Sequence, residues 1–185
     1  MRVGLAYNLR ARDDEHSAEL LTQEDVDRLL DAIRTVGHEA VAVEVTGTPE
    51  EIIDRLVEAK PDLIFNVAEG ITGVNREAYY PAIFRTLHLP FTGSSSAVLH
   101  VGLDKSLTEA ILARRGITVP RGVLITPQEQ SLPEDMPYPL IIKPNAEGSS
   151  QGISQDSIVE NADQAKTRID KLLPEYPEGL TAEQY

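Results

Sequence analysis

The sequence predicts an α/β protein with a Rossmann-like parallel sheet in its first part and a smaller α+β unit in its second part. Over about the first ninety residues, short runs rich in β-branched residues alternate with segments of helical periodicity, and the connections between them are short. From Asp104 the order changes to helix, strand, strand, helix and strand. We therefore expect two domains, residues 1–103 and residues 104–185.

Each element of the first part carries a local signal. Strands are expected at 2–7, 38–45 and 62–67, and the last is a continuous apolar run of the kind found in strands buried on both faces. Thr22 and Asp25 predict a capping box for a helix that ends at Gly37. Thr48 and Glu51 predict a second box, with Pro49 at the first helical position. A third helix is expected at 76–88.

The second part begins with a helix that Asp104 caps and Gly116 ends. Strands are expected at 117–126 and 139–143, followed by a glycine-rich loop, a helix at 162–173 and an extended segment at 180–185.

In parallel sheets such as the one predicted for the first part, ligands bind beyond the carboxyl ends of the strands. The loops after the first and third strands are long enough to carry such a site.

Composition excludes several classes of function. The net charge is -13, and the 17 basic residues are scattered, so we expect no nucleic-acid partner. The chain has no cysteine, which excludes disulfides and thiolate metal sites. The longest apolar runs are far shorter than the roughly 20 residues needed to span a bilayer, so we expect no membrane partner and a cytoplasmic location. The four histidines are far apart in sequence and predict no metal site.

The segment from Ile141 to Gly152 is the strongest chemical signal. A strand delivers Lys143, and the loop that follows holds two glycines and two serines, whose amides and hydroxyls can close over a phosphate. The lysine precedes the glycines, so the segment is neither a Walker A loop nor a dinucleotide fingerprint. Taken alone, it fits a Gly/Ser surface loop as well as a phosphate site.

Lys105 is the second signal, because it occupies the first turn of a predicted helix. The helix dipole disfavours a cation there, so a negatively charged partner would explain its placement. Such a lysine is otherwise a solvated surface charge.

These two segments, in this order and about forty residues apart, resemble the ATP-grasp superfamily, in particular the D-alanine–D-alanine ligases. The matching pieces are Asp62–Gly70, Arg76–Ala78, Leu89–Ser94, Leu103–Lys105, Gly116–Pro120, Pro139–Pro144 and Glu147–Gly152. The resemblance covers residues 60–185 and identifies 1–103 as the substrate-side domain and 104–185 as part of the ATP-binding central domain.

The resemblance also implies roles for individual residues. Lys105 and Lys143 would reach the ATP phosphates, and Ser149 or Ser150 would touch the terminal phosphate. The other implied ATP contacts are Glu147, Gly148 and Gly152 in the loop and Glu183, Gln184 and Tyr185 at the adenine hinge. In the family, ATP phosphorylates the carboxylate of one D-alanine, and the amine of a second attacks the acylphosphate.

Two departures from the family pattern affect the substrate. The usual loop after the first strand supplies a glutamate for the substrate amine, and here Glu15 would take that role; the alternative is that Asp13, Asp14 and Glu15 form only a solvated loop. The His-Gly pair that normally follows the third strand is replaced by Glu69 and Gly70, which we expect to contact substrate. The expectation that D-alanine is the substrate therefore rests on the family resemblance alone.

A third departure concerns magnesium. The family binds Mg²⁺ through a later Glu-x-Asn segment, which does not occur in this chain. We expect a fragment with little or no ligase activity alone, with its Mg²⁺ ligands outside the chain. It would form a homodimer or associate with the missing C-terminal half. The alternatives are a non-catalytic nucleotide-binding or assembly module, and one half of a split ligase for another amino acid.

Overall fold

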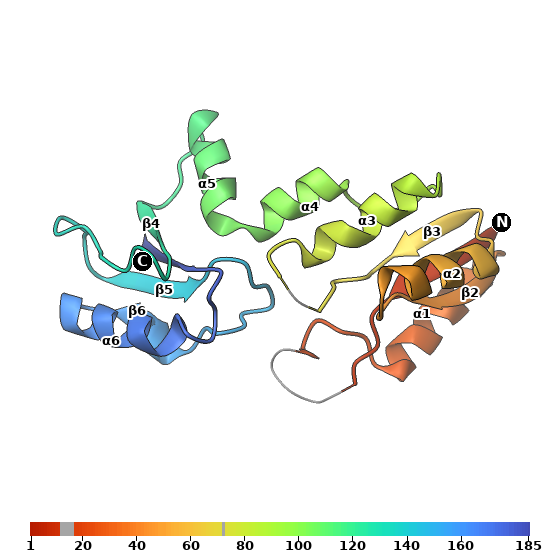
Figure 1. The fold of residues 1–185 in the computed structure, drawn as a ribbon, viewed down its shortest axis with the longest axis horizontal. Helices are drawn as coiled ribbons and strands as arrows, with labels where there is room; N and C mark the ends of the chain where they lie inside the picture. The colour runs from red at the N-terminus through yellow and green to blue at the C-terminus, as the bar shows by residue number, and fades with distance from the viewer. Residues whose placement is uncertain (12–16, 72) are drawn as a thin grey trace. The chain divides into compact units, whose positions relative to one another are not determined.

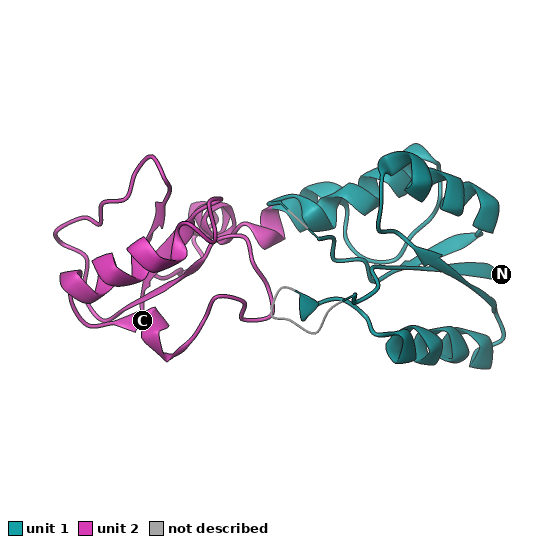
Figure 2. Ribbon diagram, turned by 60° about the horizontal axis from the view of Figure 1, so that its bottom comes forward, with its two compact units in different colours: residues 1–100 teal, residues 101–185 magenta. Residues whose placement is uncertain are grey.

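A computed structural model describes residues 1–11, 17–71 and 73–185. The chain divides into two compact units, residues 1–100 and residues 101–185, which Figure 2 shows in separate colours. Each unit has its own sheet and its own apolar core. In the described part of the chain, no helix has the length and apolar character needed to cross a membrane.

The first unit contains the predicted parallel sheet (Figure 1). Its three strands lie in the order β2-β1-β3, and both pairings of β1 are parallel. The bounds are β1 (Arg2–Tyr7), α1 (Gln23–Thr35), β2 (Glu39–Glu44), α2 (Pro49–Ala59), β3 (Leu63–Asn66), α3 (Arg76–Thr86) and α4 (Ser96–Leu103), the last continuing into the second unit. The sequence did not predict α4.

Helices cover both faces of this sheet because side chains alternate along each strand. Leu5 and Tyr7 of β1 pack against Val26 and Leu30 of α1 on one face. On the other face, a second core cluster joins residues of the three strands to α2 and α3; it includes Ala6, Val43, Ile64, Leu56 and Phe84. Ile64 belongs to this cluster and Phe65 packs against the cluster on the α1 side, so both faces of β3 are covered as expected, although β3 ends the strand order.

Both predicted capping boxes are present. Thr22 accepts from the amide of Asp25, and the Asp25 carboxylate accepts from the amide of Thr22. Thr48 and Glu51 make the same exchange at α2, where Pro49 occupies the first helical position. The hydrogen bonds lower the pKa of both acids, because they favour the carboxylate form.

The second unit contains an antiparallel sheet in the order β4-β7-β5-β6. The bounds are α5 (Lys105–Arg114), β4 (Gly122–Ile125), β5 (Leu140–Pro144), β6 (Ile158–Val159), α6 (Ala162–Leu172) and β7 (Leu180–Gln184), with a 3₁₀ turn at Gln155–Ser157. The predicted strand at 117–126 was too long, because β7 offers ladder partners only to Gly122–Ile125.

The two faces of this sheet differ in character. Leu140, Ile142, Leu180 and Ala182 point to one face, where they form a core with α6. Alternation along β5 and β7 therefore directs Lys143, Thr181 and Glu183 to the opposite face. We call this second surface the open face of the sheet.

Replacing Thr48 with alanine should lower the free energy of unfolding by about 1 kcal/mol, because the first turn of α2 loses its side-chain cap. Thr48→Ser keeps the hydroxyl and is the matched control. Denaturant unfolding followed by circular dichroism measures both, and equal losses in the two variants would contradict the capping role.

Candidate functional site at the glycine-rich loop

Lys143 lies on β5, and its side chain points to the open face. Its ammonium Nζ lies 2.6 Å from Oε2 of Glu183 on the neighbouring strand β7. The two side chains are 19% and 5% exposed. A partly buried ion pair of this kind retains much of its Coulomb attraction, since little water screens it.

The beginning of α5 is tied to the residue that follows β5. Oδ1 of Asp104 caps the helix by accepting from the Leu107 amide at 2.9 Å, and it also accepts from Nδ2 of Asn145 at 3.0 Å. Oδ1 of Asn145 in turn accepts from the Ser106 amide at 2.9 Å. This exchange fixes the first turn of α5 against the start of the glycine-rich loop.

Lys105 extends from that first turn to the loop backbone. Its Nζ donates to the carbonyl oxygen of Asn145 at 3.3 Å and to that of Glu147. Two carbonyl oxygens, which carry only partial negative charge, are thus among the partners of this cation. Lys105 of α5 therefore binds the backbone just after β5, two to four residues beyond Lys143.

The tip of the loop presents its polar groups to solvent. Ser149 and Ser150 are exposed and have positive φ angles of 45° and 62°. The Gln151 amide donates to the Gly148 carbonyl at 2.9 Å, and the Ile153 amide donates to the Ser150 carbonyl at 3.0 Å. These tight turns leave both serine hydroxyls accessible, as an anion-binding loop requires.

The far end of the loop is held by Arg168 of α6, a residue that sequence reasoning missed. Its Nη2 donates to the Gly152 carbonyl at 2.6 Å and to Oγ of Ser157 at 2.8 Å. The side chain is only 6% exposed, and this burial lowers its pKa, while Asp156 and Glu175 raise it. The available signal was an arginine at a position of the buried stripe of an amphipathic helix.

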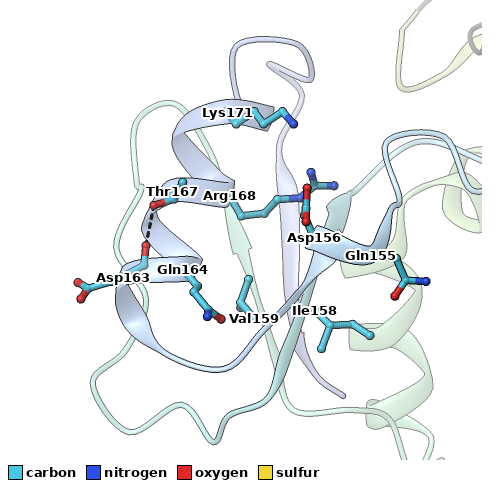
Figure 3. A pocket seen from close by; sticks show the side chains of 9 residues that line it. All are labelled: Gln155, Asp156, Ile158, Val159, Asp163, Gln164, Thr167, Arg168 and Lys171. Carbon is cyan, nitrogen blue, oxygen red and sulfur yellow. Dashed lines mark hydrogen bonds between the residues drawn. The ribbon is translucent and has the colours of Figure 1, made fainter.

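Figure 3 shows Arg168 and Asp156 in a hollow of about 590 Å³ beside the 3₁₀ turn, β6 and α6. The side chains that line it carry two acidic and two basic groups, and neither Lys105 nor Lys143 is among them. We therefore place the candidate site at the loop and not in this hollow.

The three residues of the predicted hinge have different environments. Glu183 is buried and forms the ion pair with Lys143, whereas Gln184 and Tyr185 are exposed. Their amides are used within the sheet: Gln184 donates to the Arg121 carbonyl at 2.9 Å and Tyr185 to the Pro139 carbonyl at 3.0 Å.

In the first unit, Asn8 organises the carboxyl ends of the strands. It directly follows β1 and is 1% exposed. Oδ1 accepts from the amides of Glu69 and Gly70 at 3.1 and 2.9 Å, while Nδ2 donates to the Tyr80 hydroxyl at 2.9 Å. Two of the predicted substrate contacts, Glu69 and Gly70, are therefore fixed by their backbones. The third, Glu15, lies outside the described residues.

The carboxyl group of Glu69 lies in acidic surroundings. Its pKa is raised to about 7, first by burial and then by the negative charges of Glu77 and Glu19, although Arg76 opposes the shift. Arg76 itself is buried and pairs with Glu19 at 2.9 Å. Within the described ranges, no three His, Cys, Asp or Glu side chains are grouped to hold a metal ion.

Comparison with known proteins identifies the family. The chain is 32% identical over 140 residues to D-alanine–D-alanine ligase of Gluconobacter oxydans (strain 621H), a match covering 76% of the chain and 45% of the relative. It is 35% identical over 127 residues to the ligase of that name from Anaplasma centrale, covering 68% of the chain and 60% of the relative. The chain belongs to the D-alanine–D-alanine ligase-like family of ATP-grasp proteins.

Solved structures agree with the fold of the D-alanine–D-alanine ligase-like family. The D-alanine–D-alanine ligase of Bacillus anthracis superposes with a TM-score of 0.71 at 20% identity, covering all of this chain and 57% of that one. The structure of that ligase complexed with ATP gives a TM-score of 0.69 at 19% identity, covering all of this chain and 58% of that one. No family model matches the chain. It spans about half the length of the curated relatives it matches.

Replacing Gly152 with alanine should destabilise the second unit by about 2 kcal/mol. Gly152 has a φ of 69°, and an added Cβ would come within 2.6 Å of Cγ of Pro144. Gly116→Ala is the matched control, since Gly116 has a φ of 75° with nothing within 4 Å of the added atom. Thermal or denaturant unfolding compares the two, and a smaller loss at Gly152 than at Gly116 would contradict the crowding.

Replacing Glu69 with glutamine should flatten part of the pH dependence of stability. Because the folded pKa of about 7 exceeds the ordinary 4.5, the folded state holds the proton more tightly, and stability falls as pH rises from about 4.5 to 7. At pH 8 we expect Glu69→Gln to be more stable than wild type by about 1 to 2 kcal/mol, allowing for solvent screening. Parallel stability curves from urea unfolding across this range would refute this.

Proposed function

We propose that the second unit binds the phosphates of ATP with Lys105, Lys143 and the loop 147–152. The observation that carries this proposal is that the Lys105 ammonium binds the carbonyls of Asn145 and Glu147, in the segment that starts at Lys143 and leads directly into the exposed Ser149–Ser150 tip. Two cations and a set of amides and hydroxyls are the groups that a polyphosphate binds. The net charge of -13 makes such a local arrangement necessary, since the chain as a whole would repel the ligand.

The ATP complex of the Bacillus anthracis ligase, which has the same fold, supports this choice of ligand. In our proposal, Ser149 or Ser150 donates its hydroxyl proton to an oxygen of the terminal phosphate. Gly148 and Gly152 let the backbone turn closely around it, and Glu183, Gln184 and Tyr185 lie on the adenine side. Catalysis would then be positioning and charge neutralisation.

We further propose that the chain forms part of an ATP-dependent carboxylate–amine ligase. The terminal phosphoryl group would pass from ATP to a substrate carboxylate oxygen, with ADP as the leaving group. The amine nitrogen of a second substrate would then attack the acyl carbon, forming the amide bond and releasing phosphate. D-alanine is the amino acid suggested by the names of the relatives. The described residues do not fit a magnesium site, so no step is assigned to that ion.

A second candidate is a ligase for another amino acid, favoured by the surroundings of Glu69. The carboxyls of Glu19, Glu69 and Glu77 outnumber Arg76 at the carboxyl edge of the parallel sheet. Such surroundings favour a positively charged substrate group. Comparing D-alanine with amino acids that carry a basic side chain, by calorimetry, would distinguish the two candidates.

Calorimetric titration of the full chain with Mg-ATP tests phosphate binding. We expect Lys143→Ala to weaken binding roughly ten- to hundredfold, because a charge-assisted contact contributes about 1.5 to 3 kcal/mol. Lys166→Ala is the matched control, because Lys166 is exposed on α6 and pairs with Asp170. No binding at millimolar ATP, or equal losses in both variants, would overturn the proposal.

A further inference from the structure

Two consecutive serines at the tip of the glycine-rich loop adopt a backbone conformation that residues other than glycine rarely adopt. Ser149 and Ser150 have φ angles of 45° and 62°, and Gly152 follows at 69°. Left-handed conformations at residues that carry a Cβ persist only where the surrounding structure holds them, and they cluster at functional sites. The turn hydrogen bonds of the tip join neighbouring residues only to one another. The tip therefore needs anchors outside the loop.

Arg168 supplies the anchor that follows the two serines in the chain. Its side chain extends from α6 toward the 3₁₀ turn (Figure 3), where Nη2 donates to the Gly152 carbonyl at 2.6 Å and to Oγ of Ser157 at 2.8 Å. Ser157 is buried, and its Oγ also accepts from the Ser154 amide at 3.0 Å. The guanidinium thus joins the end of the loop to a turn that is itself held by hydrogen bonds.

The burial of Arg168 is costly for a residue with these partners. The residue is 6% exposed, and in the described part of the chain no carboxylate forms an ion pair with it. Its Nε is buried without a hydrogen-bond partner. A guanidinium that exchanges water for a carbonyl and a hydroxyl, and leaves one donor unpaired, contributes less to stability than a well-packed apolar side chain can. Stability alone therefore does not explain an arginine at this position.

We propose that Arg168 is a positioning residue for phosphate binding, which acts through the Gly152 carbonyl and holds the tip in its left-handed conformation before the nucleotide binds. The inference rests on the proposed ATP binding by the second unit. Without this anchor, Ser149 and Ser150 relax to ordinary negative φ angles, and their amides and hydroxyls lose the arrangement that a phosphate binds. Nucleotide binding then has to order the tip, so affinity falls.

Calorimetric titration of the full chain with Mg-ATP compares two variants of this network. Arg168→Met fills a similar volume and removes every donor, and we expect it to weaken binding roughly tenfold, or about 1.4 kcal/mol. Ser157→Ala is the matched control, because it removes the hydroxyl and leaves the Gly152 carbonyl available to Arg168. Its affinity should stay within about twofold of wild type.

Hydrogen exchange of individual amides separates a positioning role from a general loss of stability. The Gln151 and Ile153 amides close the two turns of the tip. In ligand-free wild type we expect them to exchange at least about tenfold more slowly than in an unstructured peptide, because the tip is already ordered. In Arg168→Met their exchange should accelerate, while the amides within β5 and β7 stay protected.

Unprotected Gln151 and Ile153 amides in ligand-free wild type would overturn the proposal without any variant. Faster exchange spread equally over the tip and the strands in Arg168→Met would also overturn it, as would equal losses of affinity in the two variants. Mg-ATP binding that is unchanged in Arg168→Met would overturn this proposal and leave phosphate binding by the second unit intact. Absence of binding to wild type at millimolar Mg-ATP would overturn both.

Discussion

The second unit depends on the hydrogen bonds that join Asp104 to Asn145. Asn145 is almost fully buried, and its carbonyl accepts from both the amide and the ammonium of Lys105. The backbone amide of Asn145 donates to the carbonyl of Gly179, the residue just before β7. One side chain and its backbone thus align a helix, a strand end and the glycine-rich loop. A buried amide with this many partners is costly to leave unsatisfied, so the arrangement specifies a single geometry.

Asn8 has the corresponding place in the first unit. It also follows a strand directly and is buried. Its side chain forms hydrogen bonds with groups of other elements, including the Tyr80 hydroxyl and the amides of the residues after β3. In both units, an asparagine after a central strand forms hydrogen bonds that hold the neighbouring segments in place at the end of the sheet. The candidate contacts Glu69 and Gly70 therefore owe their positions to a residue distant in sequence.

Local signals in the sequence predicted most of the fold. The caps at Thr22, Thr48 and Asp104 and the two strand periodicities were sufficient, because they depend on neighbours within a few residues. The short ladder of β4, the two-residue β6 and the loop anchor Arg168 could not be predicted in the same way. Each depends on which distant segment packs beside it, which single-sequence patterns do not encode. The same holds for the pairing of Lys143 with Glu183.

The loop 147–152 is bounded by two cations that bind main-chain oxygens, Lys105 at Glu147 and Arg168 at Gly152. Carbonyl oxygens are present whatever the side chain, so the two hydrogen bonds themselves require no particular side chain, although the φ of 69° and the close approach of Pro144 still favour glycine at position 152. Substitutions at the exposed positions between them can alter what the tip recognises while its two ends stay in place. The ends of the loop are thus held largely by side chains of α5 and α6, so the exposed residues of the tip can change during evolution.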